Sequence, residues 1–117
     1  MHKFSLETAG ANDSAYPVLT TAAMKSRVVG PGRTASVTEH VWYITWGATS
    51  TVGAVVIETA PAEDYTGTWT PVAAELVWSA AAKTDVVRYN GVLAATRVRC
   101  TTTTDGGGVT VRHAGAR

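Results

Sequence analysis

The sequence predicts an all-β fold, an antiparallel β-sandwich of the jelly-roll type preceded by an N-terminal arm. Threonine and valine are abundant, and both are β-branched residues that suit a pleated sheet. Gly, Pro, Asn and Asp recur at short intervals, and no long segment keeps a helical period with capping signals. A chain of 117 residues is typical of one domain. We therefore expect residues 1–16 to form an arm or first strand and residues 17–117 a single sandwich domain.

The first third of the chain gives short, interrupted patterns. Alternating apolar and polar residues near the start permit one strand within residues 1–16. Residues 17–26 are interpreted as a strand, with a short helix over residues 20–25 as the alternative. A Gly-Pro-Gly sequence at residues 30–32 then predicts a turn, because Gly relieves steric limits and Pro fixes φ.

Two strong strand patterns follow. Residues 33–46 alternate with bulky side chains on both faces, so we expect this strand to be covered on both sides. One face carries His40, Trp42, Ile44 and Trp46. The apolar run inside residues 51–59 is typical of a strand in a sandwich core.

The second half continues with short strands between turn signals. Asn90-Gly91 and the Gly-rich residues 105–108 are strong turn signals, and the second of them predicts a closing hairpin. Residues 73–82 stay open between strand and irregular structure. In the closing hairpin the inward-facing residues are Val98, Cys100, Val109 and Val111, with Arg97 and Arg99 on the other face. The remaining predicted elements are a loop over 60–67 and strands over 68–72, 85–89, 92–103 and 109–113.

Charge and composition exclude several classes of partner. The net charge is +1 and no basic stripe is present, which argues against nucleic-acid binding. No run approaches the roughly 20 apolar residues of a membrane span, and no secretory leader is visible. Cys100 is the single cysteine, so no disulfide forms within the chain, and we expect a small buried apolar side chain there.

Candidate catalytic and metal-binding residues are few. His2, His40 and His113 stand in no metal-ligand spacing, and the serines stand in no nucleophile motif. Glu58 and the pair Glu63 and Asp64 surround one loop. They suggest a calcium site or a hydrolase acid–base pair as alternatives to a solvated loop. We expect neither a cofactor nor a metal, and no enzymatic activity.

Four tryptophans are unusual for so short a chain: Trp42, Trp46, Trp69 and Trp78. Core packing is the first interpretation of each one. An exposed tryptophan would instead provide a contact for a protein partner or a stacking platform for a sugar. A carbohydrate-binding module therefore stays open as an alternative function.

The order of motifs in the second half carries a family resemblance. Gly53-Ala-Val-Val-Ile-Glu58 is followed by an acidic loop and Thr68-Trp-Thr-Pro-Val72, then by Ala95-Thr-Arg-Val-Arg-Cys-Thr-Thr, a Gly-rich turn and Val109-Thr-Val-Arg112. Over residues 53–112 this order resembles small β-sandwich proteins of tailed-bacteriophage virions, and capsid decoration or cement proteins fit best. The loop Ala60-Pro-Ala-Glu-Asp-Tyr65 departs from the family pattern, because it lacks the Ser-Asn-Asp-Gly turn.

The resemblance implies a protein that binds the outer surface of the assembled head and bridges major capsid protein subunits. It implies a location on the virion and self-association as a homodimer or homotrimer, without nucleic acid or membrane as a partner. A tail- or fibre-associated virion protein is the alternative within the same group. We expect the arm residues Phe4 and Leu6 and the turn residues Pro31 and Arg33 to contact partners.

Overall fold

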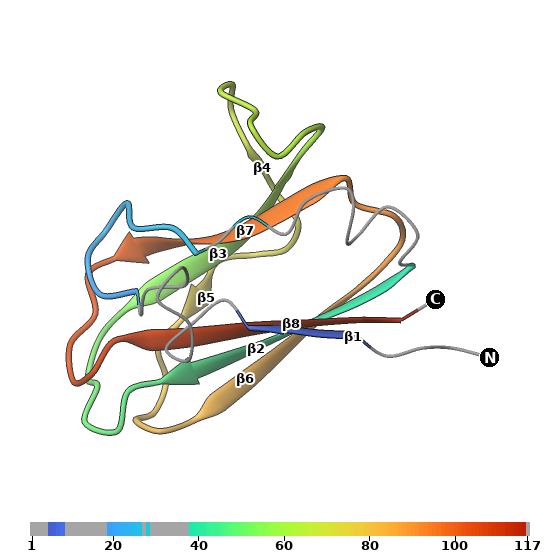
Figure 1. Ribbon diagram of the computed structural model, residues 1–117. Helices are drawn as coiled ribbons and strands as arrows, with labels where there is room; N and C mark the ends of the chain where they lie inside the picture. The colour runs from blue at the N-terminus through green and yellow to red at the C-terminus, as the bar shows by residue number, and fades with distance from the viewer. Residues whose placement is uncertain (1–4, 9–18, 27, 29–37, 117) are drawn as a thin grey trace.

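A computed structural model of the chain describes residues 5–8, 19–26, 28 and 38–116, and it confirms the all-β sandwich (Figure 1). Two antiparallel sheets pack face to face, with the core side chains between them. The described residues contain eight strands. Their bounds are β1 Ser5–Thr8, β2 Glu39–Trp46, β3 Ala54–Ala60, β4 Thr70–Pro71, β5 Leu76–Val77, β6 Thr84–Asn90, β7 Ala95–Thr102 and β8 Val109–Ala116.

The strand order is that of a jelly roll. The first sheet, called sheet A, has the order β1-β8-β2-β6. In the second, called sheet B, β3 pairs with β7 on one side and with the short strands β4 and β5 on the other. Residues 23–26 extend sheet B beyond β7, where Cys100 N–H donates to Met24 O at 2.8 Å, whereas Leu19 bridges Val109 of β8 in sheet A. The chain therefore crosses repeatedly between the sheets, as two nested Greek keys require.

The core follows from alternation along the strands. In β2 the even-numbered residues point into the sandwich and are buried, and they pack with inward residues of the neighbouring β8 and of β3 and β7 in the opposite sheet. The fully buried large side chains include Leu19, Trp42, Ile44, Trp46, Val55, Val98, Val109 and Val111. The inward direction predicted for Val98, Cys100, Val109 and Val111 is confirmed.

Several expected elements differ from the observed ones. Residues 19–26 form a turn between two isolated bridges, so neither the predicted strand nor the alternative helix is present there. A tight turn in which Ala23 has φ 77° prevents a continuous ladder. Cover on both faces, expected for residues 33–46, is only partial in the described part: on the outer face Val41 is buried, but Glu39 is exposed and Tyr43 is half-buried.

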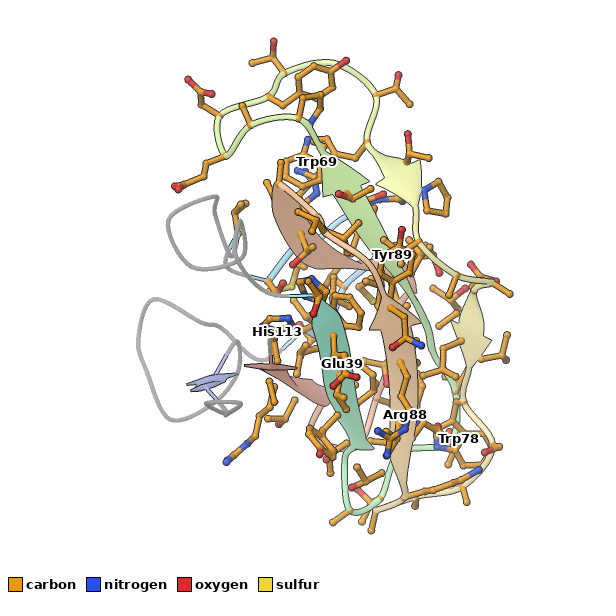
Figure 2. The ribbon with its side chains drawn as sticks, turned by 90° about the vertical axis from the view of Figure 1, so that its right-hand side faces the viewer. Glu39, Trp69, Trp78, Arg88, Tyr89 and His113 are labelled. Carbon is orange, nitrogen blue, oxygen red and sulfur yellow. The ribbon has the colours of Figure 1, made fainter. Side chains whose placement is uncertain are left out.

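The segment between β3 and β6 is less regular than the pattern predicted. The expected strand over residues 68–72 shortens to the two-residue β4, and within residues 73–82 only the two-residue β5 pairs with β3. The β3–β4 hairpin extends beyond the sandwich (Figure 1). Trp69 lies at the base of this hairpin, where its Nε1–H donates to Tyr65 O at 3.1 Å (Figure 2).

One end of the sandwich is held by Asp105, at the turn between β7 and β8. Its carboxylate accepts hydrogen bonds from Thr51 N–H at 2.6 Å and from the Thr51 hydroxyl at 2.5 Å. These hydrogen bonds lower the pKa of Asp105. Gly106 has φ 63° and lies so close to Ser50 that a Cβ atom would clash with its backbone. The Gly-rich turn predicted from the sequence thus also fastens the β2–β3 connection.

Candidate interaction surface

The predicted cluster of carboxylates is not assembled as an acid–base pair. Glu58 lies on β3 with 2% of its side chain exposed, and Arg97 Nε donates to its Oε1 at 2.8 Å. Arg99 Nε donates to the same oxygen at 3.2 Å. Glu63 and Asp64 lie exposed in the loop beyond β3. Glu58 therefore serves as the counter-charge of two arginines from β7.

Trp69 completes this cluster on the side of the hairpin. The Arg97 guanidinium carbon lies 4.1 Å from the centre of the Trp69 ring, a cation–π geometry. The register between β3 and β7 places Glu58 directly opposite Arg97. The cluster thus joins the two long strands of sheet B and the base of the projecting hairpin.

Sheet A buries two histidines side by side. His40 Nδ1 and His113 Nε2 are 2.9 Å apart, so one ring nitrogen donates its proton to the other. His40 stacks on Trp42 with ring centres 5.6 Å apart. Burial and the neighbouring His40 lower the pKa of His113 to about 4, so that His113 is neutral at pH 7. In the sequence these histidines stand in no metal-ligand spacing, and their contact with each other was not predicted.

Other reactive groups are dispersed or buried. In the part of the chain that the structure describes, no three His, Cys, Asp or Glu side chains gather in a way that could hold a metal ion. Burial raises the pKa of the Cys100 thiol, whose Sγ–H donates to Thr102 O at 3.1 Å. No helix among the described residues has the length and apolarity needed to cross a bilayer.

The tryptophans mostly belong to the core. Trp42, Trp46 and Trp69 are buried, which removes them as stacking platforms for a sugar. Trp78 is half-buried, and its Nε1 atom is buried without a hydrogen-bond partner among the described residues. Trp78 lies at the side of the sandwich between β6 and the β4–β5 segment (Figure 2).

This side of the sandwich, which we call the open side, is where the core is least covered. Because β4 and β5 have only two residues each, no long strand among the described residues closes sheet B next to β6. Most of the half-buried apolar side chains that pack on the core come from this region. They are Val72, Leu76, Trp78, Val87 and Tyr89.

Two hollows flank the open side at the ends of β3. The first has a volume of about 300 Å³ and is bordered by Val52, Val77 and Trp78. The second, of about 460 Å³, lies at the far end of β3 between Tyr65 and Val92. All of these except Trp78 are exposed, from 40% for Tyr65 to 61% for Val77. Exposed apolar side chains that border hollows are typical of protein contact surfaces.

The partner-contacting residues predicted from the sequence lie elsewhere. Phe4, Pro31 and Arg33 fall outside the described residues. Only the backbone of Leu6 is described, in β1 opposite Ala114 of β8. The open side was not predicted, since only a short strand over residues 85–89 was expected at the position of β6.

Comparison with known protein families, with curated proteins and with solved structures found no match to this chain. What the chain does is therefore inferred from its own residues and geometry.

Proposed function

We propose that the chain is a bacteriophage capsid decoration protein that binds the outer surface of the assembled head and bridges major capsid protein subunits. The observation that carries this proposal is the group of exposed apolar side chains at the two hollows that flank the open side. The sequence resemblance over residues 53–112 supports it independently. That stretch includes β3, from which both hollows are built.

The physical basis of such a function is mass action. A protein that binds only the assembled lattice stabilises that lattice relative to free subunits. A stable contact of this kind buries on the order of 1,600 Å² in total. Repetition over a symmetric shell multiplies a modest contact, so that no reaction and no cofactor are required.

The two hollows suit different parts of such a contact. The hollow at the start of β3 presents Val52 and Val77, which are 47% and 61% exposed. The hollow at the end of β3 lies roughly 20 Å further along the strand, beside the acidic loop with Glu63 and Asp64. One major capsid protein subunit would bind at each hollow, and strand β3, which runs between the two hollows, would bridge the two subunits.

The test is co-sedimentation of the purified chain with undecorated heads built from the major capsid protein of the same phage. We expect saturable binding, and heads that resist heat or low salt better when decorated. Val77→Lys should weaken binding at least tenfold, while Thr49→Lys, at an exposed position in the β2–β3 turn, should bind normally. No co-sedimentation with heads, or binding to tails alone, would overturn the proposal in favour of another virion role.

A further inference from the structure

Strand β6 forms a regular edge of sheet A. Among the described residues only β2 pairs with it, and the seven-residue register is continuous. The strand has no Pro or Gly, although proteins commonly blunt an edge with Pro, a bulge or a short strand. Sheet B has such a blunted edge beside it, where β4 and β5 are two-residue pieces. Strand β6 is thus able to pair along its whole length.

Hydrogen bonds at the two ends of β6 show which of its backbone N–H and C=O groups point toward β2. Lys83 O accepts from Trp46 N–H at 3.0 Å, and Gly91 N–H donates to Thr38 O at 2.7 Å. Odd-numbered positions therefore face β2, because backbone direction alternates along a strand. The N–H and C=O groups of the even-numbered residues point to the open edge: Thr84, Val86, Arg88 and Asn90.

We propose that β6 pairs antiparallel with β6 of a second copy of this chain, about a two-fold axis at Val87. This pairing joins two four-stranded sheets into one continuous sheet across the dimer. Thr84 then lies opposite the partner's Asn90, and Val86 lies opposite the partner's Arg88. All of the outward-pointing backbone groups of β6 find partners in this register.

Charge and geometry favour this register over the other symmetric pairings of β6 with a second copy. In antiparallel pairing, opposite residues have their side chains on the same face of the sheet. In a symmetric pair the axis therefore lies between the two copies of one residue, which are opposite each other. An axis at Arg88 would set two guanidinium groups directly against each other, which is destabilising. An axis at Val86 would run Asn90 past the strand into the turn at Ala82, where φ is 58°. The axis at Val87 gives the full overlap of the seven residues and keeps the two Arg88 side chains apart, because each lies opposite the partner's Val86.

The same pairing covers apolar surface that the single chain leaves open. Val86 is 48% exposed on the outer face of β6. On the inner face, Val87 and Tyr89 are half-buried at the open side, where Figure 2 shows Tyr89 between β6 and sheet B. The side chains of a partner strand added beside β6 would contact Val86 on the outer face and Val87 and Tyr89 on the inner face.

Sedimentation velocity and mass by light scattering test the dimer on the purified full-length chain without heads. We expect a concentration-dependent species of twice the 12.2 kDa chain mass. Val86→Lys, which sets a cation opposite the partner's Arg88, should weaken dimerisation at least tenfold. Val86→Glu, at the same position, should dimerise as well as or better than the parent and become more sensitive to salt.

Controls separate an edge effect from misfolding. Thr66→Lys changes an exposed position in the loop between β3 and β4, which projects away from β6, and should leave the dimer intact (Figure 1). Both Val86 variants should keep the thermal transition of the folded domain, because this side chain points outward. A chain that stays monomeric at all concentrations, or equal behaviour of Val86→Lys and Val86→Glu, would overturn the proposal. The dimer does not depend on the decoration function, since it is measured without capsids.

Discussion

The two sheets bury polar groups in opposite ways. Sheet B holds a carboxylate, Glu58, between two guanidinium groups on the neighbouring strand. Sheet A holds two imidazoles, His40 and His113, that bond to each other beside Trp42. The first cluster is charged and neutralised by its partners, whereas His113 in the second is kept neutral by burial.

The difference shows two ways in which a short chain holds polar side chains at buried positions. Arg97 and Arg99 reach Glu58 from a face that is partly open to solvent, so their charges remain hydrated. The histidines have 1% and 3% of their surface exposed, so a positive charge there would lose its hydration. The charged cluster should therefore respond mainly to loss of a partner, and the imidazole pair mainly to pH.

Loss of Glu58 should give the largest effect on stability. Glu58→Ala leaves two arginines without their shared acceptor at a buried position. Removal of one partner of a buried pair costs about 3–5 kcal/mol, and the partial exposure of Arg99 favours the lower half of that range. Urea unfolding monitored by tryptophan fluorescence measures the change. The exposed Glu63→Ala variant is the matched control and should change the free energy of unfolding by less than about 0.5 kcal/mol. An equal small effect in both variants would show that the Glu58 cluster does not stabilise sheet B.

Acid should act through the imidazole pair. His113 has a pKa of about 4 in the folded chain, against 6.5 as its ordinary value. Between these values the unfolded chain binds more protons, so stability is highest above pH 6.5 and falls as the pH drops toward 4. The loss should reach about 3 kcal/mol, since each pKa unit corresponds to about 1.4 kcal/mol.

A His113→Gln variant isolates this effect from the other titrating groups. Gln still offers a hydrogen bond to His40 but has no proton to gain in this pH range. Denaturant titrations at pH 7 and at pH 4.5 should show a smaller pH-dependent loss in the variant than in the parent chain. If the free energy of unfolding falls equally between pH 7 and pH 4.5 in the variant and the parent chain, His113 does not control the loss of stability in acid.

The two clusters also differ in how far the sequence could reveal them. Alternation within β7 and β8 correctly separated inward Val98 and Val111 from Arg97 and Arg99, because strand periodicity is a local property. The partnership of Glu58 with those arginines depends on the register between β3 and β7, which lie far apart in the sequence. Likewise, the pairing of β2 with β8 brings His40 and His113 together, and periodicity alone does not specify strand partners.

The region between β3 and β6 shows the other limit of the sequence patterns. Thr, Trp and Val in residues 68–78 have high β propensity, yet only four residues pair, in β4 and β5. Propensity reports how well a residue fits a pleated surface, and none of the described strands lies on the far side of β4 and β5 to complete that surface. The open side arises from this tertiary context, so the sequence alone did not predict it.

A third polar contact sharpens the comparison, because it combines a buried neutral donor with a surface charge pair. Asp85 Oδ2 accepts from Trp46 Nε1–H at 2.9 Å, and Asp85 Oδ1 lies 3.1 Å from Lys83 Nζ. Asp85→Ala should destabilise the domain by about 2 kcal/mol, since it leaves the indole N–H of buried Trp46 without an acceptor. Lys83→Ala should cost less than about 0.5 kcal/mol, because the lysine side chain is 49% exposed and solvent screens its charge. Urea unfolding of the two variants at one low protein concentration compares the contacts directly. A larger effect for Lys83→Ala would mean that charge, and not burial, decides the strength of polar contacts in this fold.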